Sequence, residues 1–116
     1  MNIMITKFGP HRLALTCDKK KAEQIVDDMI AQFEDTFTFM ELCNSVRLKA
    51  NEEGLLDKEP NTRYEGEIEL SFNEIEKINL IVWKMIWERQ LMILLYKNPY
   101  GPLNDGDFRF KKVDYH

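Results

Sequence analysis

The stretch EIELSFNEIEKINLIVWKMIWERQLMILLYKN, residues 67–98, is the most apolar part of the chain and decides its fold. Ser71 is followed three residues later by Glu74, a spacing that predicts a capping box and the start of a helix. Apolar residues then recur at three- and four-residue steps until about Arg89, where the helical period lapses. We therefore expect a helix that begins after Ser71, followed by a strand over the continuous apolar run LMILLYK.

The predicted helix has two apolar faces when its residues are placed at 100° each. The first face spans about 100°, the usual width of a stripe that packs on a core. Its members are Ile75, Ile78, Val82, Met85 and Ile86. The second face holds Leu80, Trp83 and Trp87 and lies nearer the polar side of the helix. These three residues are either the edge of an unusually broad core or a contact surface.

Residues after this helix indicate a C-terminal hairpin. The segment NPYGPLNDGD is rich in turn residues, and DFRFKKV then alternates aromatic with basic side chains. Two antiparallel strands joined by that turn-rich loop are the best interpretation.

Two more helices are predicted upstream. Asp18 is a natural N-cap for KKKAEQIVDDMIAQFED, whose apolar residues follow the helical period. Thr38 and Glu41 predict a capping box, and Gly54 predicts the end of the second helix. Between the two helices lies DTFTF, a short β-prone run. The residues expected to face inward from the second helix are Leu42, Cys43, Val46 and Ala50.

The remaining segments carry weaker signals. Residues 55–66, LLDKEPNTRYEG, are predicted to form a loop, and EIELSF after them is expected to include a brief strand. Residues 1–17 contain two short apolar runs around Gly9 and Pro10, which fit either a hairpin or an irregular N-terminal arm.

Length and composition indicate one folded domain, residues 1–116, with a formal net charge of −4. The acidic excess lies in the middle third of the chain, which argues against a surface that grips phosphate throughout. No apolar run reaches the roughly 18 residues that a bilayer crossing needs, and the N-terminus lacks the features of a secretory signal. We expect a cytoplasmic protein with reduced thiols and no membrane association.

The order of the predicted elements is helix, short strand, helix, loop, helix and hairpin. Over residues 18–113 this order resembles the winged-helix arrangement. The resemblance implies an α+β fold in which TFTF pairs with the hairpin and the third helix follows the second. We therefore expect a three-helix winged-helix-like domain with a short strand and a C-terminal β-hairpin, preceded by the N-terminal arm or hairpin.

Winged-helix proteins that bind DNA place the third helix in the major groove and the wing on the backbone. Carried onto this chain, the resemblance implies a nucleic-acid-binding set of Asn73, Lys77, Lys84, Lys97, Arg109, Lys111 and Lys112. The third helix departs from this pattern, because Glu74 and Glu76 repel a duplex and Leu80 does not suit base edges.

Winged helices also serve as protein-protein modules, and aromatic residues are enriched at the centres of such interfaces. The predicted protein interface consists of Leu80, Trp83, Trp87, Tyr96 and Tyr100. We expect a non-enzymatic interaction module or regulatory adaptor that forms a homodimer or docks a protein partner. A sequence-specific DNA-binding transcriptional regulator is the alternative.

Enzymatic chemistry has little support in the sequence. His11 lies in the N-terminal segment and His116 is the last residue, so neither is placed like a general base. Cys43 is expected to be a small core residue. The segment LNDGD lacks the ligand series of a calcium loop and is read as a turn. We predict no catalytic residues, no metal and no small-molecule cofactor.

Overall fold

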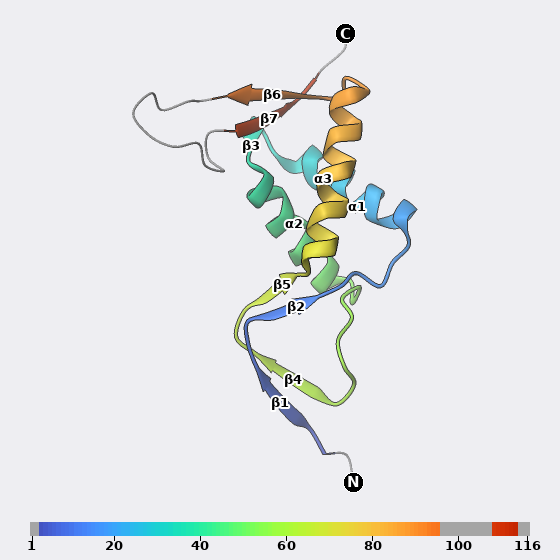
Figure 1. The fold of residues 1–116 in the computed structure, drawn as a ribbon, viewed down its shortest axis with the longest axis vertical. Coiled ribbons are helices and arrows are strands. Elements are labelled where there is room, and N and C mark those ends of the chain that lie inside the picture. Colours follow the sequence, from blue (N-terminus) through green and yellow to red (C-terminus); the bar gives the residue numbers. More distant parts are fainter. Residues whose placement is uncertain (1–2, 96–107, 114–116) are drawn as a thin grey trace, which may run out of the picture.

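The computed structural model describes residues 3–95 and 108–113 and shows a mixed α+β fold (Figure 1). Three helices and seven strands appear in these ranges. In chain order they are β1 Ile5–Phe8, β2 His11–Leu13, α1 Lys19–Gln32, β3 Thr36–Phe37, α2 Phe39–Glu52, β4 Thr62–Glu65, β5 Ile68–Leu70, α3 Phe72–Trp87, β6 Leu91–Leu95 and β7 Phe108–Lys112. The expected α+β class with a C-terminal antiparallel strand pair is confirmed.

The antiparallel sheet has the order β3–β7–β6, so the short strand between the first two helices pairs with the C-terminal strands as expected. Phe37 lies opposite Phe110 and is 1% exposed. Its ring stacks on Phe33, with the ring centroids 4.7 Å apart. This aromatic cluster ties the sheet to the end of α1, where it contributes to the core.

The first two helices begin where the sequence predicts. Asp18 caps α1 by accepting a hydrogen bond from the Lys21 amide at 2.8 Å. At the start of α2 the capping box of Thr38 and Glu41 is formed, and Gly54 follows the helix with a φ of +70°. A positive φ is readily adopted by glycine, which explains this residue at the terminator. The four predicted inward residues of α2 are all buried.

The inner face of α3 packs on the other two helices. Its buried apolar residues are Ile78, Ile81, Val82 and Met85. Ile75 and Ile86, expected within the stripe, are partly buried and pack against the core. The core stripe is therefore rotated toward Ile81 relative to the prediction, and this rotation turns the Trp83 side of the helix further from the core.

The N-terminal strands pair with the connection between α2 and α3. β1 runs parallel to β4, and β2 runs parallel to β5. The prediction of a loop over residues 55–66 is wrong in its second half, where β4 forms, because this polar segment is extended only by its pairing with β1. The brief strand expected in EIELSF is confirmed as β5.

The two paired segments, β1–β2 and β4–β5, each bend at a glycine between their strands. Gly66, between β4 and β5, has a φ of +97°, and a Cβ atom there would lie 3.1 Å from the Gly9 amide nitrogen. Gly9 precedes Pro10 at the bend between β1 and β2. The two strands therefore approach closely and turn together, which side chains at these positions would obstruct.

The molecule is elongated, with a longest dimension of 59 Å. β2 and β5 lie beside the helices, whereas β1 and β4 extend away from them, toward the N-terminus and opposite the end that carries β6 and β7 (Figure 1). We call the β1–β4 pair, Ile5–Phe8 with Thr62–Glu65, the ribbon arm. The helices and the antiparallel sheet form the body of the protein.

Candidate functional site

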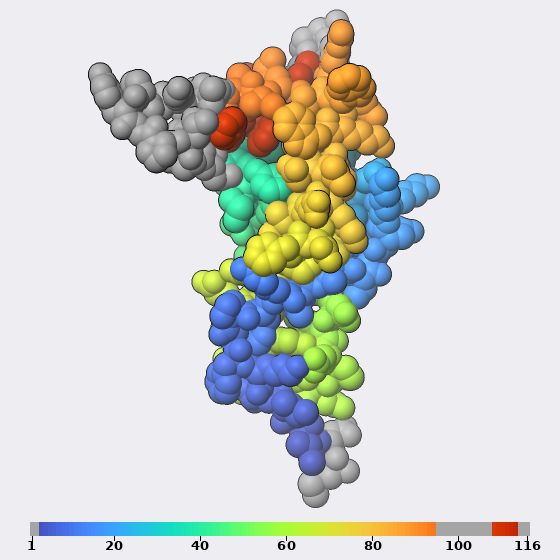
Figure 2. Space-filling view, in the orientation of Figure 1, coloured from blue at the N-terminus to red at the C-terminus, as the bar shows by residue number. Residues whose placement is uncertain are grey.

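Four large apolar side chains of α3 are exposed: Phe72 at its start, and Leu80, Trp83 and Trp87 in its second half on the face opposite its core stripe. Trp87 is 88% exposed, Leu80 is 62% exposed and Trp83 is 54% exposed. At 100° per residue they fall within an arc of about 60°. Figure 2 shows the side chains of α3, coloured yellow to orange, running along the front of the body. We call these three residues the α3 ridge.

The ridge exists because α3 is apolar over most of its circumference while only one side has a partner. Its inner residues contact α1 and α2, and the helix leads directly into the buried Leu91 of β6. An amphipathic helix on a monomer normally keeps its outer face polar. Large apolar side chains gathered on one exposed face are typical of an interaction surface.

Charged residues flank the ridge on the same helix. Glu76 and Lys84 are both exposed and stand four residues before and four residues after Leu80. Lys84 lies 4.0 Å from Glu23 of α1, the limit of an ion pair, and its side chain is 57% exposed. Both charges therefore remain available to a partner that covers Leu80.

The capping box predicted at Ser71 and Glu74 does not form, and this part of the sequence prediction is wrong. The Ser71 side chain makes no cap hydrogen bond. Its backbone amide instead donates to the Leu13 carbonyl at 2.9 Å, in continuation of the β2–β5 pairing. Because that amide is already satisfied, Glu74 has no cap to close.

Glu74 points instead into a pocket between α3 and the start of α1. The pocket has a volume of about 340 Å³, and Leu15, Cys17 and Ile81 contribute to its apolar lining. Glu74 is 5% exposed, and its Oε1 lies 3.4 Å from the Lys77 ammonium. Burial raises the pKa of the Cys17 thiol, and the negative charges of Asp18 and Glu74 add to the rise.

Among the residues predicted to bind nucleic acid, Lys77 and Arg109 have partners within the protein, whereas Lys84 and Lys111 lie at the 4.0 Å limit of an ion pair and are exposed. Lys77 pairs with Glu74, and Lys111 lies 4.0 Å from Asp35. Arg109 donates through Nε to the Thr36 hydroxyl at 2.7 Å and through Nη2 to Glu41 at 3.5 Å, so it fastens β7 to β3 and α2. Asn73 and Lys112 are exposed. A duplex would have to compete with these acidic partners for the cations.

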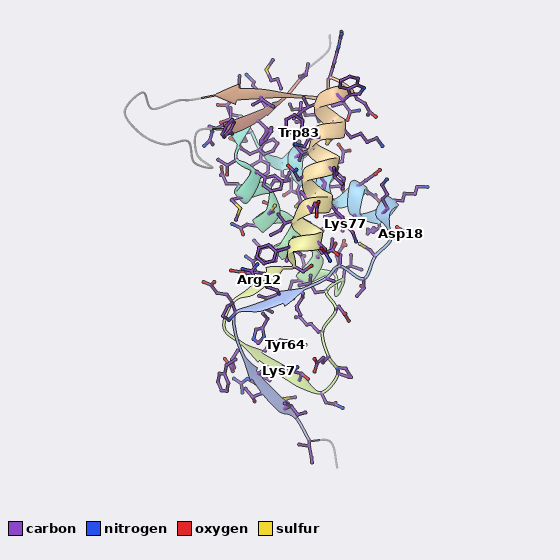
Figure 3. The ribbon with its side chains drawn as sticks, in the orientation of Figure 1. Lys7, Arg12, Asp18, Tyr64, Lys77 and Trp83 are labelled. Atoms are coloured by element: carbon purple, nitrogen blue, oxygen red, sulfur yellow. The ribbon has the colours of Figure 1, made fainter. Side chains whose placement is uncertain are left out.

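Lys77, at the start of α3, and Trp83, further along it, are both labelled in Figure 3, and Asp18 lies nearby at the start of α1. The predicted residues Tyr96, Tyr100 and Lys97 lie outside the described residues.

His11, which was not expected to be a catalytic residue, is buried at the bend of the N-terminal strands. There its Nε2 donates a hydrogen bond to the Glu65 carbonyl at 2.8 Å.

Sequence reasoning missed the apolar surface of the ribbon arm. Met4, Ile5 and Phe8 are all exposed, and Phe8 is 81% exposed. The run IMITKF carries the composition of a strand, and that signal was visible. Its partner was not, because the paired residues 62–65 lie about half of the chain length away in the sequence.

In the ranges that the structure describes, no group of three or more His, Cys, Asp or Glu side chains is arranged to hold a metal ion. None of the helices in those ranges combines the length and apolar character required to cross a membrane. Comparison of the chain with protein-family models, curated proteins and solved structures finds no match.

Proposed function

We propose that the protein is a non-enzymatic interaction module that self-associates through the α3 ridge, in the cytoplasmic setting expected from its sequence. The observation that carries this proposal is the exposure of Leu80, Trp83 and Trp87 on one face of one helix. Tryptophan is among the residues that contribute most to binding at interface centres. A second copy of α3 supplies a matching apolar face.

The charges of Glu76 and Lys84 support a second copy of the chain as the partner that covers the α3 ridge. Two α3 helices that cross antiparallel, with the two-fold axis at Leu80, place Glu76 of each copy opposite Lys84 of the other. Two complementary ion pairs then flank an apolar centre, an arrangement that fixes register as well as orientation. The same two-fold axis brings the Phe72 end of one helix to the Trp87 end of the other, and Phe72 is also exposed.

The winged-helix resemblance is consistent with this proposal, because that arrangement serves protein binding as well as DNA binding. The DNA-binding alternative has less support, since the third helix presents tryptophans and acidic residues where phosphate contacts are required. It predicts binding to duplex DNA at low salt that is lost on Lys111→Glu with Lys112→Glu.

Tryptophan fluorescence tests the proposal directly, because the only two tryptophans of the chain belong to the ridge. As protein concentration rises, we expect their emission to shift to the blue as association removes the indoles from water. Leu80→Asp should abolish the shift by placing a charge at the two-fold axis. Emission of exposed indole at every concentration would contradict the proposal.

A charge exchange tests the register. Glu76→Lys and Lys84→Glu should each raise the dissociation constant by about tenfold, since each creates two like-charge pairs worth roughly 0.5–1 kcal/mol apiece. The double variant should restore association. Asp28→Lys, which makes the same change in charge as Glu76→Lys but on the exposed side of α1, is the matched control for that variant and should leave the constant unchanged. A double variant weaker than either single variant would exclude the antiparallel register.

A further inference from the structure

Within the described ranges, the ribbon arm leaves one edge of β1 unpaired, at a site separate from the α3 ridge. Among the described residues, the only strand that pairs with β1 is β4, so the other edge of β1 is uncovered by any strand. Two-stranded sheets are marginal by themselves in water, and parallel pairs are normally buried on both faces. The ribbon arm has neither a third strand nor a buried face around Phe8.

The backbone groups of this edge follow from the register. Ile5 donates to the Asn61 carbonyl at 2.9 Å, and Gly9 donates to the Glu65 carbonyl at 2.6 Å, so odd-numbered residues bond to β4. Alternate residues of a strand turn their N–H and C=O groups to opposite edges. Thr6 and Phe8 therefore direct theirs away from β4.

The usual protection of such an edge is weak in this strand. Natural edge strands are commonly guarded by a charged side chain, most often lysine. The only charged residue of β1 is Lys7, which is labelled in Figure 3. Its ammonium lies 2.7 Å from a carboxylate oxygen of Glu59 in the same chain. This interaction raises the pKa of Lys7. The other residues of the edge are apolar or neutral.

We infer that β1 pairs antiparallel with β1 of a second copy, around a two-fold axis at Thr6, to form a four-stranded sheet β4–β1–β1–β4. This register uses the outward backbone groups of even-numbered residues, as hydrogen-bonded antiparallel pairs require. It sets Thr6 opposite Thr6, and Met4 opposite Phe8 twice, on one face of the sheet. Contacts between a thioether and an aromatic ring are favourable.

The side chains on the opposite face of the sheet are also compatible with a two-fold axis at Thr6. There Ile5 of each copy lies opposite Lys7 of the other, where the lysine stem covers the isoleucine while its ammonium stays at Glu59. A register centred elsewhere on an even-numbered residue loses at least one of the two Met4–Phe8 contacts. Self-complementarity of backbone and side chains together favours a second copy over an unrelated strand.

This contact goes beyond the α3 ridge and is separable from it. Each chain would contact one copy through α3 and another through β1, so a closed assembly contains at least four chains. Leu80→Asp should leave a dimer held by β1 alone. Adding Thr6→Pro, which removes an outward amide and spares the bonds to β4, should give a monomer, with a dissociation constant raised at least tenfold.

Sedimentation equilibrium of these variants tests the inference, with Leu80→Asp/Thr6→Val as the control that retains the amide and should remain dimeric. Leu80→Asp/Phe8→Asp is a second disruptive variant that leaves the backbone intact, and it should also be monomeric. Amide exchange by NMR should show Thr6 and Phe8 protected only where the dimer is populated.

A Leu80→Asp variant that is monomeric at every concentration, with Thr6 and Phe8 unprotected, would overturn the inference. The tryptophan shift of the otherwise native chain would then still report on the ridge alone. Protection of both amides in a monomer would equally contradict a second copy as the occupant of this edge.

Discussion

Two helices of this protein begin with the same signal, and only one of them uses it. At α2, Glu41 donates its amide to the Thr38 hydroxyl at 3.1 Å, and Glu41 accepts from the Thr38 amide at 3.0 Å. At α3 the equivalent residues Ser71 and Glu74 make neither bond. The difference lies in the backbone amide of the cap residue. The Thr38 amide donates to the Glu41 side chain, whereas the Ser71 amide donates to the Leu13 carbonyl.

A capping box therefore requires a cap residue whose amide has no other acceptor. β5 enters α3 without a break, and its neighbour β2 supplies a carbonyl at the position that the glutamate would occupy. Glu74 is consequently released to line the pocket beside α1, where it is nearly buried. The same four-residue pattern gives a helix cap in one place and a buried carboxylate in the other.

The largest expected change in unfolding free energy comes from removing the hydroxyl of Thr38, and it should exceed the change from removing that of Ser71. Thr38→Ala should lower the free energy of unfolding by about 1 kcal/mol, the usual cost of losing an N-cap side chain. Ser71→Ala is the matched variant and should cost no more than a few tenths, because its hydroxyl caps nothing. Urea unfolding of both variants at pH 7 measures the difference. Equal losses would mean that Ser71 caps α3 after all.

Smaller changes in stability are expected from substitutions of the two glutamates, Glu41 and Glu74. Glu41→Leu should lower the free energy of unfolding by about 0.5–1 kcal/mol, because the Thr38 amide loses its acceptor. Glu74→Leu should leave it unchanged or raise it by up to about 1 kcal/mol, since an apolar side chain replaces a buried carboxylate while Lys77 remains in solvent. The same urea titration measures both. Destabilisation by Glu74→Leu as large as that by Glu41→Leu would contradict the contrast.

Local signals in the sequence predicted most of the body of the protein. The N-cap at Asp18, the capping box at Thr38 and the terminator at Gly54 each depend on residues a few positions apart. They can therefore be recognised in the sequence without knowledge of the fold. The pairing of TFTF with the C-terminal strands also followed, through the order of elements that resembles a winged helix. Periodicity placed Leu80, Trp83 and Trp87 outside the core stripe but left open whether they were the edge of a broad core or a contact surface, and the structure shows that all three are exposed.

Contacts between distant segments that the winged-helix order of elements does not include were not predicted. β4 has a polar sequence, TRYE, and becomes a strand only because β1 lies beside it. The loss of the cap at Ser71 depends on Leu13, and the burial of Glu74 depends on the start of α1. In each case a contact between segments far apart in the sequence overrides the local preference, and a single sequence does not reveal that contact.

The smallest expected effect is a change in the pKa of the Cys17 thiol when the nearby Glu74 carboxylate is neutralised. Desolvation is the main cause of the raised pKa of this thiol, and Glu74 is a lesser one. Glu74→Gln should therefore lower the pKa of Cys17 slightly, and alkylation by iodoacetamide below that pKa should become faster as the thiolate fraction rises. Peptide mass spectrometry distinguishes Cys17 from Cys43, which is buried in α2.

Glu41→Gln is the control for this measurement, because Glu41 is not among the charges that act on Cys17. Its alkylation profile should match that of the native chain across the whole pH range. A Glu74→Gln profile that also matches would place the Glu74 carboxylate away from the pocket. The two helix starts would then differ only in whether their caps form, and the release of the glutamate would have no chemical consequence at Cys17.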